Sequence, residues 1–203
     1  MKLKLCNIIC VMGIILVNAS IVFAYDNENT HPNIITPRAV TITTNTLSGY
    51  DEYDQYYLRL RQGTIDADVP VGKTLNHFYN PVTGAGGAGI FFNVPSAVVY
   101  STSIWKTAVN SYASDNKEEA YYNMGHVLHL LQDMASSAHV YNDAHVAESN
   151  GYEDWVSTAA QYTPSLLLNG TSISQPVADV TGDGTVDYRD YLHEVVKKTS
   201  FSV

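Results

Sequence analysis

The chain has 203 residues, which is enough for one domain with a hydrophobic core of its own. It is acidic: 20 Asp and Glu residues stand against 11 Lys and Arg, a formal charge of −9 at pH 7. This balance argues against bulk binding of nucleic acid, because such binding neutralises phosphates with basic side chains. A phosphate-containing substrate is not excluded, because bound dications would invert the local charge.

Residues 1–24 have the pattern of a secretory signal peptide. A short basic start with Lys2 and Lys4 precedes an apolar run that ends in small residues. We therefore expect a secreted protein, extracellular or periplasmic, with an uncleaved membrane anchor as the alternative. Cleavage leaves nine basic and 20 acidic residues, a formal charge of −11. It also removes the only cysteines, Cys6 and Cys10, so any metal must be held by His, Asp, Glu or backbone.

The next part of the chain predicts a helix start, a surface helix and a long loop. Thr30-His31-Pro32 has the capping residue and early proline of a helix start. Residues 50–61 are charged and rich in tyrosine, which favours a surface helix that ends at Gly63. Residues 64–93 contain two prolines and five glycines and predict a loop. Loops of this length in compact domains are usually functional or held in place by other contacts.

From Pro95 the pattern becomes helical. A helix is expected to about Ala113, and the Ser-Asp-Asn sequence at 114–116 indicates a break and a cap. A second helix over 117–136 carries an apolar stripe for a core, and Gly125 allows another backbone to approach it. A second stripe on this helix consists of Tyr122, His126, His129 and Asp133. Buried polar groups on such a stripe need partners, and a metal ion would supply them.

Residues 126–155 hold four of the seven histidines. His129 and Asp133 are four apart, so a helix places both on one face, one turn apart. A loop over 137–150 and a third helix over 152–161 are expected to follow. Nitrogen and oxygen ligands at this density, with no thiols, are what zinc or another divalent ion of similar hardness requires.

The C-terminal region carries a separate signal. Residues 166–178 predict a linker, and residues 179–203 a calcium-binding segment of the EF-hand type. Gly184 stands at the sixth position of a twelve-residue loop, where the EF-hand requires glycine. The expected calcium ligands are Asp179, Thr181, Asp183, Thr185, Asp187 and Asp190. One loop without a clear entering helix resembles half of a dockerin module, and a solvated acidic turn is the alternative.

Three segments together resemble the bacterial zinc-dependent phospholipase C family, which is related to the zinc nucleases of single-stranded nucleic acid. They are NHFYNPVTG at 76–84, GHVLHLLQDMASSAHVYNDAH at 125–145 and GYEDWV at 151–156. The resemblance covers about residues 29–160, and we expect the corresponding domain to occupy residues 25–165. It implies an all-α fold and a site for two to three zinc ions.

Carried over by position, the resemblance also implies the ligands. The first zinc would be held by His77, His129 and Asp133, a second by Asp133 and His31, and the last by His139, His145 and Glu153. Asp133 would bridge two ions, because a carboxylate has two oxygens. Asp68 would be the general base that takes a proton from the attacking water, with Asp66 as its rival.

The chain departs from the family pattern in three places. The family's N-terminal tryptophan supplies ligands through its own backbone, whereas the mature chain is expected to start at Tyr25. The family's last histidine precedes its glutamate by four residues, whereas His145 precedes Glu153 by eight and Glu148 by three. We prefer Glu153 because its GYEDWV context matches, with Glu148 as the alternative. The family also has more helix where this chain has the calcium loop.

These features predict a secreted zinc hydrolase of phosphodiester bonds, most specifically a phospholipase C. Its substrate would be a phospholipid or another phosphodiester, met at a membrane surface, and one calcium ion would bind near the C-terminus. We expect a monomer without stable nucleic-acid binding. The alternatives are a zinc nuclease or other phosphoesterase, and a non-catalytic module stabilised by metal.

Overall fold

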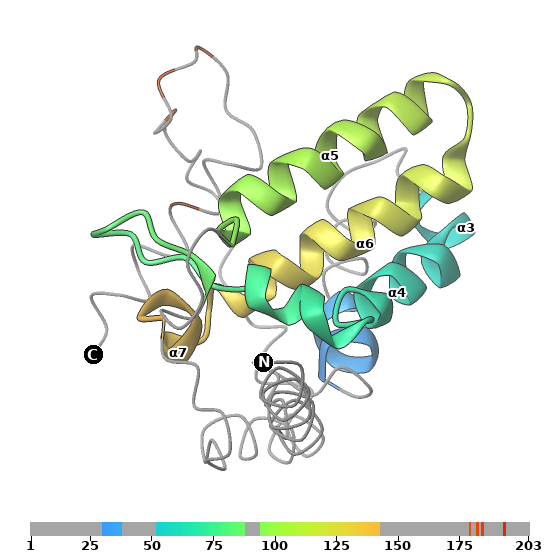
Figure 1. The fold of residues 1–203 in the computed structure, drawn as a ribbon. Helices are drawn as coiled ribbons and strands as arrows, with labels where there is room; N and C mark the ends of the chain where they lie inside the picture. Colours follow the sequence, from blue (N-terminus) through green and yellow to red (C-terminus); the bar gives the residue numbers. More distant parts are fainter. Residues whose placement is uncertain are drawn as a thin grey trace, which may run out of the picture.

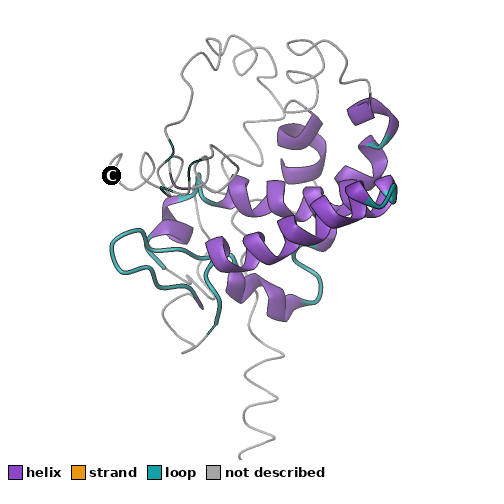
Figure 2. Ribbon diagram, turned by 90° about the horizontal axis from the view of Figure 1, so that it is seen from above, coloured by secondary structure: helices purple, strands orange, loops and turns teal. Residues whose placement is uncertain are grey.

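The computed structural model describes residues 30–37, 52–87 and 94–142, together with Asp179, Gly182, Gly184 and His193. This part of the chain consists of helices and loops without a strand, as the sequence predicts (Figure 2). No described helix is long and apolar enough to cross a membrane. In chain order the elements are the π-helix η1 (Thr30–Ile35), α3 (Glu52–Gln55), α4 (Tyr57–Asp66), the 3-10 helix η2 (Val71–Asn76), α5 (Ala97–Ala113), α6 (Lys117–Asp133) and α7 (Ser137–Val140).

Helices α5 and α6 form a hairpin whose ends are set by local capping (Figure 1). The Ser96 side chain accepts a hydrogen bond from the Val99 N–H at the start of α5. Asn116 does the same for the Glu119 N–H at the start of α6. The predicted break at 114–116 is therefore confirmed, and α6 ends at Asp133, slightly before the expected position.

Helix α6 lies between α4 and α5 and packs on both (Figure 1). Its predicted apolar stripe is confirmed, since Val127 and Met134 are buried. One cluster of buried residues joins Met134 to Ala97 of α5 and Val140 of α7. A second joins α6 to Leu60, which is fully buried on α4. The core therefore fixes both neighbours of α6, and with them the segments that follow each helix.

The prediction that Gly63 ends a surface helix is wrong. Helix α4 continues through Gly63 to Asp66, and it lies against α6 at a backbone crossing. A Cβ on Gly63 would collide with the Tyr122 carbonyl, and a Cβ on Gly125 would collide with the Leu60 carbonyl. Glycine is thus required here by close approach, which confirms the expectation for Gly125 and explains why the same residue type does not stop α4.

The long loop predicted over 64–93 is shorter in the structure, because it begins with the last turn of α4 and contains η2. Its centre is held by two backbone hydrogen bonds, from the Ala97 N–H to the Phe78 carbonyl and from the Tyr79 N–H to the His139 carbonyl. The loop expected over 137–150 likewise begins with the short helix α7.

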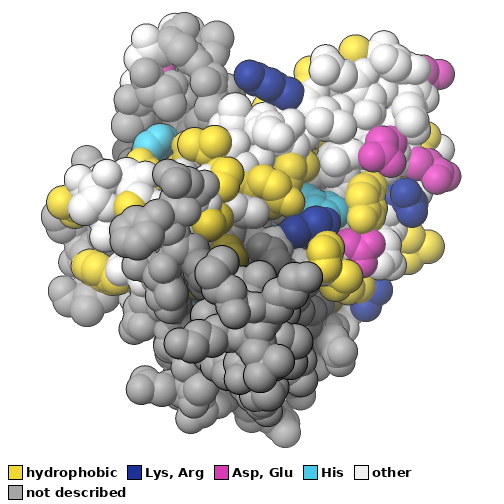
Figure 3. Space-filling model, viewed as in Figure 1, with side chains coloured by type: hydrophobic (Ala, Val, Ile, Leu, Met, Phe, Trp, Pro, Cys, Tyr) yellow, Lys and Arg dark blue, Asp and Glu magenta, His cyan; other side chains and the backbone are white. Residues whose placement is uncertain are grey.

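On the face shown in Figure 3, the basic side chains of the described residues stand apart and do not gather into one patch. The proposed leader over 1–24, the linker over 166–178 and most of the predicted calcium loop lie outside the described residues.

Candidate metal centre

Five imidazole and carboxylate side chains meet near the C-terminal end of α6. They come from four segments that are far apart in the sequence, and none is more than 2% exposed. The five are His31 on η1, Asp68 after α4, His77 after η2, and His129 and Asp133 on α6. The packing of α4 and η1 on α6 therefore brings these segments together.

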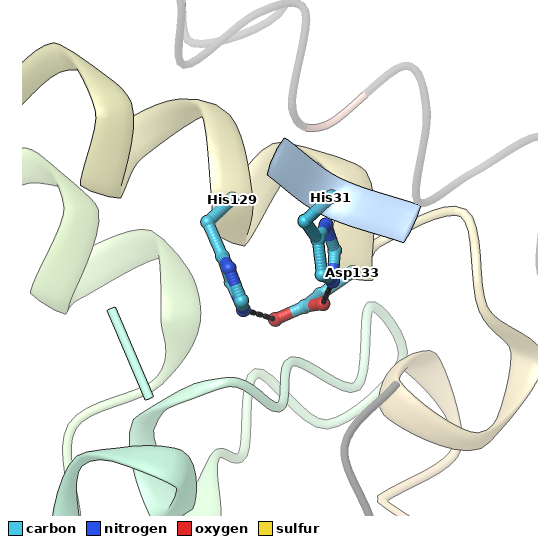
Figure 4. Close-up of side chains that lie close together, drawn as sticks. All are labelled: His31, His129 and Asp133. Carbon is cyan, nitrogen blue, oxygen red and sulfur yellow. Dashed lines mark ion pairs between the residues drawn. The ribbon is translucent and has the colours of Figure 1, made fainter. Parts of the chain in front are cut away.

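The first group consists of His31, His129 and Asp133. Figure 4 shows both imidazoles reaching Asp133, His129 from its own helix and His31 from η1. The distances are 3.2 Å from His31 Nε2 to Asp133 Oδ1 and 3.4 Å from His129 Nε2 to Asp133 Oδ2. The two imidazole rings stack with centroids 3.9 Å apart. Two nitrogens thus approach different oxygens of one carboxylate.

The second group consists of Asp68, His77 and His129. Asp68 places Oδ1 3.5 Å from His77 Nδ1 and Oδ2 3.5 Å from His129 Nε2. His77 Nδ1 also lies 2.7 Å from Oδ2 of Asp133. In each group, one candidate ligand atom per residue lies within 4.8 Å of the others. The groups share His129, so together they form one continuous cluster.

The rings of His129 and His139 are oriented by backbone carbonyls. Nδ1 of His129 lies 2.8 Å from the Thr64 carbonyl oxygen, and Nδ1 of His139 lies 2.7 Å from the His77 carbonyl oxygen. A carbonyl only accepts, so each Nδ1 carries a proton, and in the neutral ring each Nε2 keeps its lone pair. Metal-binding histidines are commonly held in this way, with the second ring nitrogen donating to a carbonyl or carboxylate.

The buried polar atoms of the cluster fit a metal ion. Among the described residues, no hydrogen bond of acceptable geometry reaches Oδ2 of Asp68 or either carboxylate oxygen of Asp133. Burial is costly for a carboxylate, and a coordinated cation would offset that cost, as the imidazoles around Asp133 do in part. The donor set is imidazole and carboxylate, which suits zinc and similar divalent ions. The cluster can therefore hold a metal ion.

The two carboxyl groups of the cluster differ in their electrostatics. Burial raises the pKa of Asp68, and the nearby His129 and His77 only partly offset this effect. Burial also opposes ionisation of Asp133, but the surrounding imidazoles, His129 foremost, hold its pKa well below the usual range. Asp133 is thus compensated by the imidazoles without a metal, whereas Asp68 is not.

The two histidines nearest both carboxylates have raised pKa values. Burial lowers the pKa of His77, but contact with Asp133 and the charge of Asp68 outweigh burial. Burial also lowers the pKa of His129, but the charges of Asp133 and Asp68 have the larger effect, and the net pKa is raised. Protons and a metal ion would therefore compete for the same two rings.

The structure distinguishes Asp68 from Asp66, which the sequence left as rivals. Asp66 lies on α4 and accepts hydrogen bonds from the Tyr122 hydroxyl at 3.0 Å and from Gln62 Nε2 at 2.9 Å. Asp68, which follows the helix, turns into the cluster. From this position Asp68 can serve as a metal ligand or as a general base.

The residues expected to hold the last zinc are only partly described. His139 is 3% exposed on α7, and its ring stacks on Phe78 with centroids 4.4 Å apart. Among the described residues it belongs to neither group of three. His145, Glu153 and the alternative ligand Glu148 lie outside the described residues, so this third site stays a prediction.

Sequence reasoning missed the groups that orient the imidazoles. Thr64 supplies a carbonyl to His129, and Gln132 places Oε1 2.6 Å from His31 Nδ1. Gln132 stands three residues after His129 on the same helix, and that spacing could have suggested it. No sequence signal marks Thr64, because its carbonyl reaches His129 only through the crossing of α4 and α6.

The predicted calcium loop is described at three positions. The Asp179 carboxylate accepts hydrogen bonds from the backbone N–H groups of Gly182 at 2.6 Å and Gly184 at 2.8 Å. Both glycines have positive φ, 72° and 90°. Calcium binding stays a prediction, because the other expected ligands lie outside the described residues.

An apolar pocket of about 330 Å³ lies at the other end of α6 from the cluster. Its walls include Tyr53 of α3, Trp105 and Tyr112 of α5, and Tyr121 of α6. No residue of the metal cluster lines it, so the cluster and this pocket are separate features.

Comparisons of the chain with family models and with curated protein sequences give no match.

Proposed function

We propose that the chain is a secreted zinc-dependent hydrolase of phosphodiester bonds that acts on phospholipid headgroups as a phospholipase C. The observation that carries the proposal is the buried cluster in which two groups of three ligands share His129 and the two oxygens of Asp133 face different imidazoles. Such a carboxylate suits bridging of two ions, which is an arrangement that phosphodiester hydrolysis uses.

Each residue of the cluster has a role in the proposed reaction. Zinc ions, when bound, supply Lewis acidity and lower the pKa of water. His77, His129 and Oδ2 of Asp133 would hold one ion, and His31 with Oδ1 of Asp133 would hold its neighbour. Asp68 also offers an oxygen that can accept a proton, and burial raises its pKa toward the range useful for a general base.

The proposal is tested by metal content and by substrate choice. The protein is purified without added metal, its zinc is counted, and hydrolysis of phosphatidylcholine is compared with cleavage of single-stranded DNA. His129→Ala and Asp133→Ala should each abolish turnover of the lipid. His126→Gln is the matched control, because His126 lies one turn away with Nδ1 3.2 Å from the Tyr122 carbonyl oxygen and belongs to neither group. Full hydrolysis in both alanine variants would contradict the proposal, and cleavage of DNA alone would favour a nuclease.

A second candidate is a non-catalytic module stabilised by metal. It is favoured by the burial of the cluster, since no member is more than 2% exposed and a structural metal site needs no open position for water or substrate. Tight zinc binding, together with loss of folding on chelation and no turnover of any phosphodiester, would select this candidate.

A further inference from the structure

Gln132 lies beside the cluster and connects η1 to α6. Its Oε1 is 2.6 Å from His31 Nδ1, and its Nε2 donates to Thr36 Oγ1 at 3.2 Å. Thr36 is fully buried, and its hydroxyl lies 3.5 Å from that of Thr64, which is also fully buried. The Thr64 hydroxyl donates to the Leu60 carbonyl at 3.0 Å. A chain of hydrogen bonds therefore runs from the His31 ring to the backbone of α4.

The direction of this chain is fixed at its far end. The Leu60 carbonyl can only accept, so the single hydroxyl proton of Thr64 is used there. Thr64 Oγ1 must then accept from Thr36, and Thr36 Oγ1 must accept from Gln132. Only the amide nitrogen of Gln132 can donate, which turns its Oε1 toward His31. The amide orientation of Gln132 therefore follows from its hydrogen-bond partners.

The same direction fixes the tautomer of His31. With Oε1 facing it, Nδ1 must carry the ring proton, and Nε2 keeps the lone pair 3.2 Å from Asp133 Oδ1. A Gln132 amide turned the other way would present its NH₂ to Nδ1. The ring proton would then sit on Nε2, and that nitrogen could not bind a metal.

Thr64 sets the second imidazole of the same group. Its carbonyl accepts from Nδ1 of His129 at 2.8 Å, while its hydroxyl takes part in the chain that ends at His31. One residue of α4 thus influences the tautomers of two stacked rings, whose centroids are 3.9 Å apart.

We propose that Gln132 is a positioning residue that, through Thr36 and Thr64, holds His31 in the tautomer whose Nε2 faces the metal centre. The inference rests on the proposed function only in requiring that the site bind zinc. It does not depend on the substrate or on turnover.

The test compares Gln132→Leu with Gln132→Glu and uses Gln62→Leu as the matched control. Gln62 is an exposed helical glutamine whose Nε2 bonds Asp66 on the same helix. Zinc affinity is measured by competition with a chromophoric chelator. The His31 tautomer is read from ¹⁵N shifts of the metal-free protein, and helix content by circular dichroism. Gln132→Leu should weaken the zinc held by His31 by about 10- to 100-fold. Gln132→Glu keeps an acceptor for Nδ1–H and should stay within about threefold, and the control should be unchanged.

The outcomes separate the inference from the proposed function. If the wild-type chain binds no zinc, the proposed function fails. If it binds zinc and Gln132→Leu binds the same number of ions with the same affinity, the positioning role is refuted. If Gln132→Leu does not fold, the decision rests on the other two measurements. A neutral His31 ring whose single proton is on Nε2 in the wild-type chain, or a zinc affinity in Gln132→Glu that falls as for a lost ligand, would overturn the proposal.

Discussion

Asp133→Asn is the most informative single change, because it removes one charge and keeps the shape of a fully buried side chain. In metal-free protein, Asp133 lies within 3.5 Å of three imidazole nitrogens, on His31, His77 and His129. When His77 and His129 are protonated, the substitution leaves their buried positive charge without its partner. That loss costs about 3–5 kcal/mol of unfolding free energy. When the rings are neutral, the substitution affects mainly the contact of His77 Nδ1 with Oδ2 of Asp133, at about 1 kcal/mol.

The sign of the pH dependence follows from the imidazoles. The pKa values of His77 and His129 are raised above the ordinary 6.5 in the folded protein. Their protonation therefore stabilises the fold fully below about pH 6.5, and that contribution is lost as pH rises through the higher folded values. In the variant, burial and the remaining charge of Asp68 act on the rings, so most of this stabilisation disappears. The penalty of Asp133→Asn should thus be larger at acidic pH.

Urea unfolding in the presence of a chelator, followed by circular dichroism at about pH 6 and pH 8.5, measures this difference. Asp66→Asn is the matched control, because Asp66 hydrogen-bonds Tyr122 and Gln62 outside the cluster. The control should cost about 1 kcal/mol at both pH values. An equal penalty for Asp133→Asn at the two pH values would refute the electrostatic reasoning.

Three further outcomes are expected. Asp68→Asn should stabilise metal-free protein by roughly 1 kcal/mol in urea unfolding, because burial raises the pKa of Asp68. The same change should weaken zinc binding at least about 10-fold in chelator competition. A loss of stability in metal-free protein would contradict the first expectation. Gly125→Ala should cost roughly 1–3 kcal/mol in thermal unfolding, because its Cβ would meet the Leu60 carbonyl, and an unchanged Tm would show that the helices separate easily. Asp179→Asn should weaken calcium binding at least about 10-fold in titration calorimetry, and a wild-type chain that binds no calcium would remove the predicted loop site.

The α5–α6 hairpin could be predicted because its signals are local. Ser96 and Asn116 cap the helices with their own side chains, and the apolar stripe of α6 has a regular helical spacing. The continuation of α4 through Gly63 could not be predicted in this way. Glycine commonly marks a helix end, and the reason for it here is the Tyr122 carbonyl on another helix. Close approach of two backbones is a tertiary fact that a single segment does not carry.

Some residues of the candidate site could likewise be predicted from local spacing, whereas others are brought together only by the fold. His129 and Asp133 are neighbours by helical spacing alone, and the structure places them 3.4 Å apart. The inclusion of His31 and Asp68 came from resemblance to a family, since no periodicity joins residues so far apart. Asp66 and Asp68 could not be separated by sequence, because the end of α4 decides which carboxylate turns inward. Asp66, the last residue of α4, bonds Tyr122 and Gln62, whereas Asp68 lies just beyond the helix and reaches the cluster.

Zinc affinity should fall steeply as pH is lowered, and the fall should begin above pH 6.5. Zinc binds only neutral imidazole. Burial lowers the pKa values of His77 and His129, but Asp133 and Asp68 raise them by more, so both values lie above the ordinary one. Each displaced proton costs about 10-fold in affinity per pH unit below the folded pKa, so two rings give up to about 100-fold. Calorimetry in buffers of different ionisation enthalpy counts the protons released. Release of no protons at pH 6.5, with affinity independent of pH, would show that the two rings do not hold the metal.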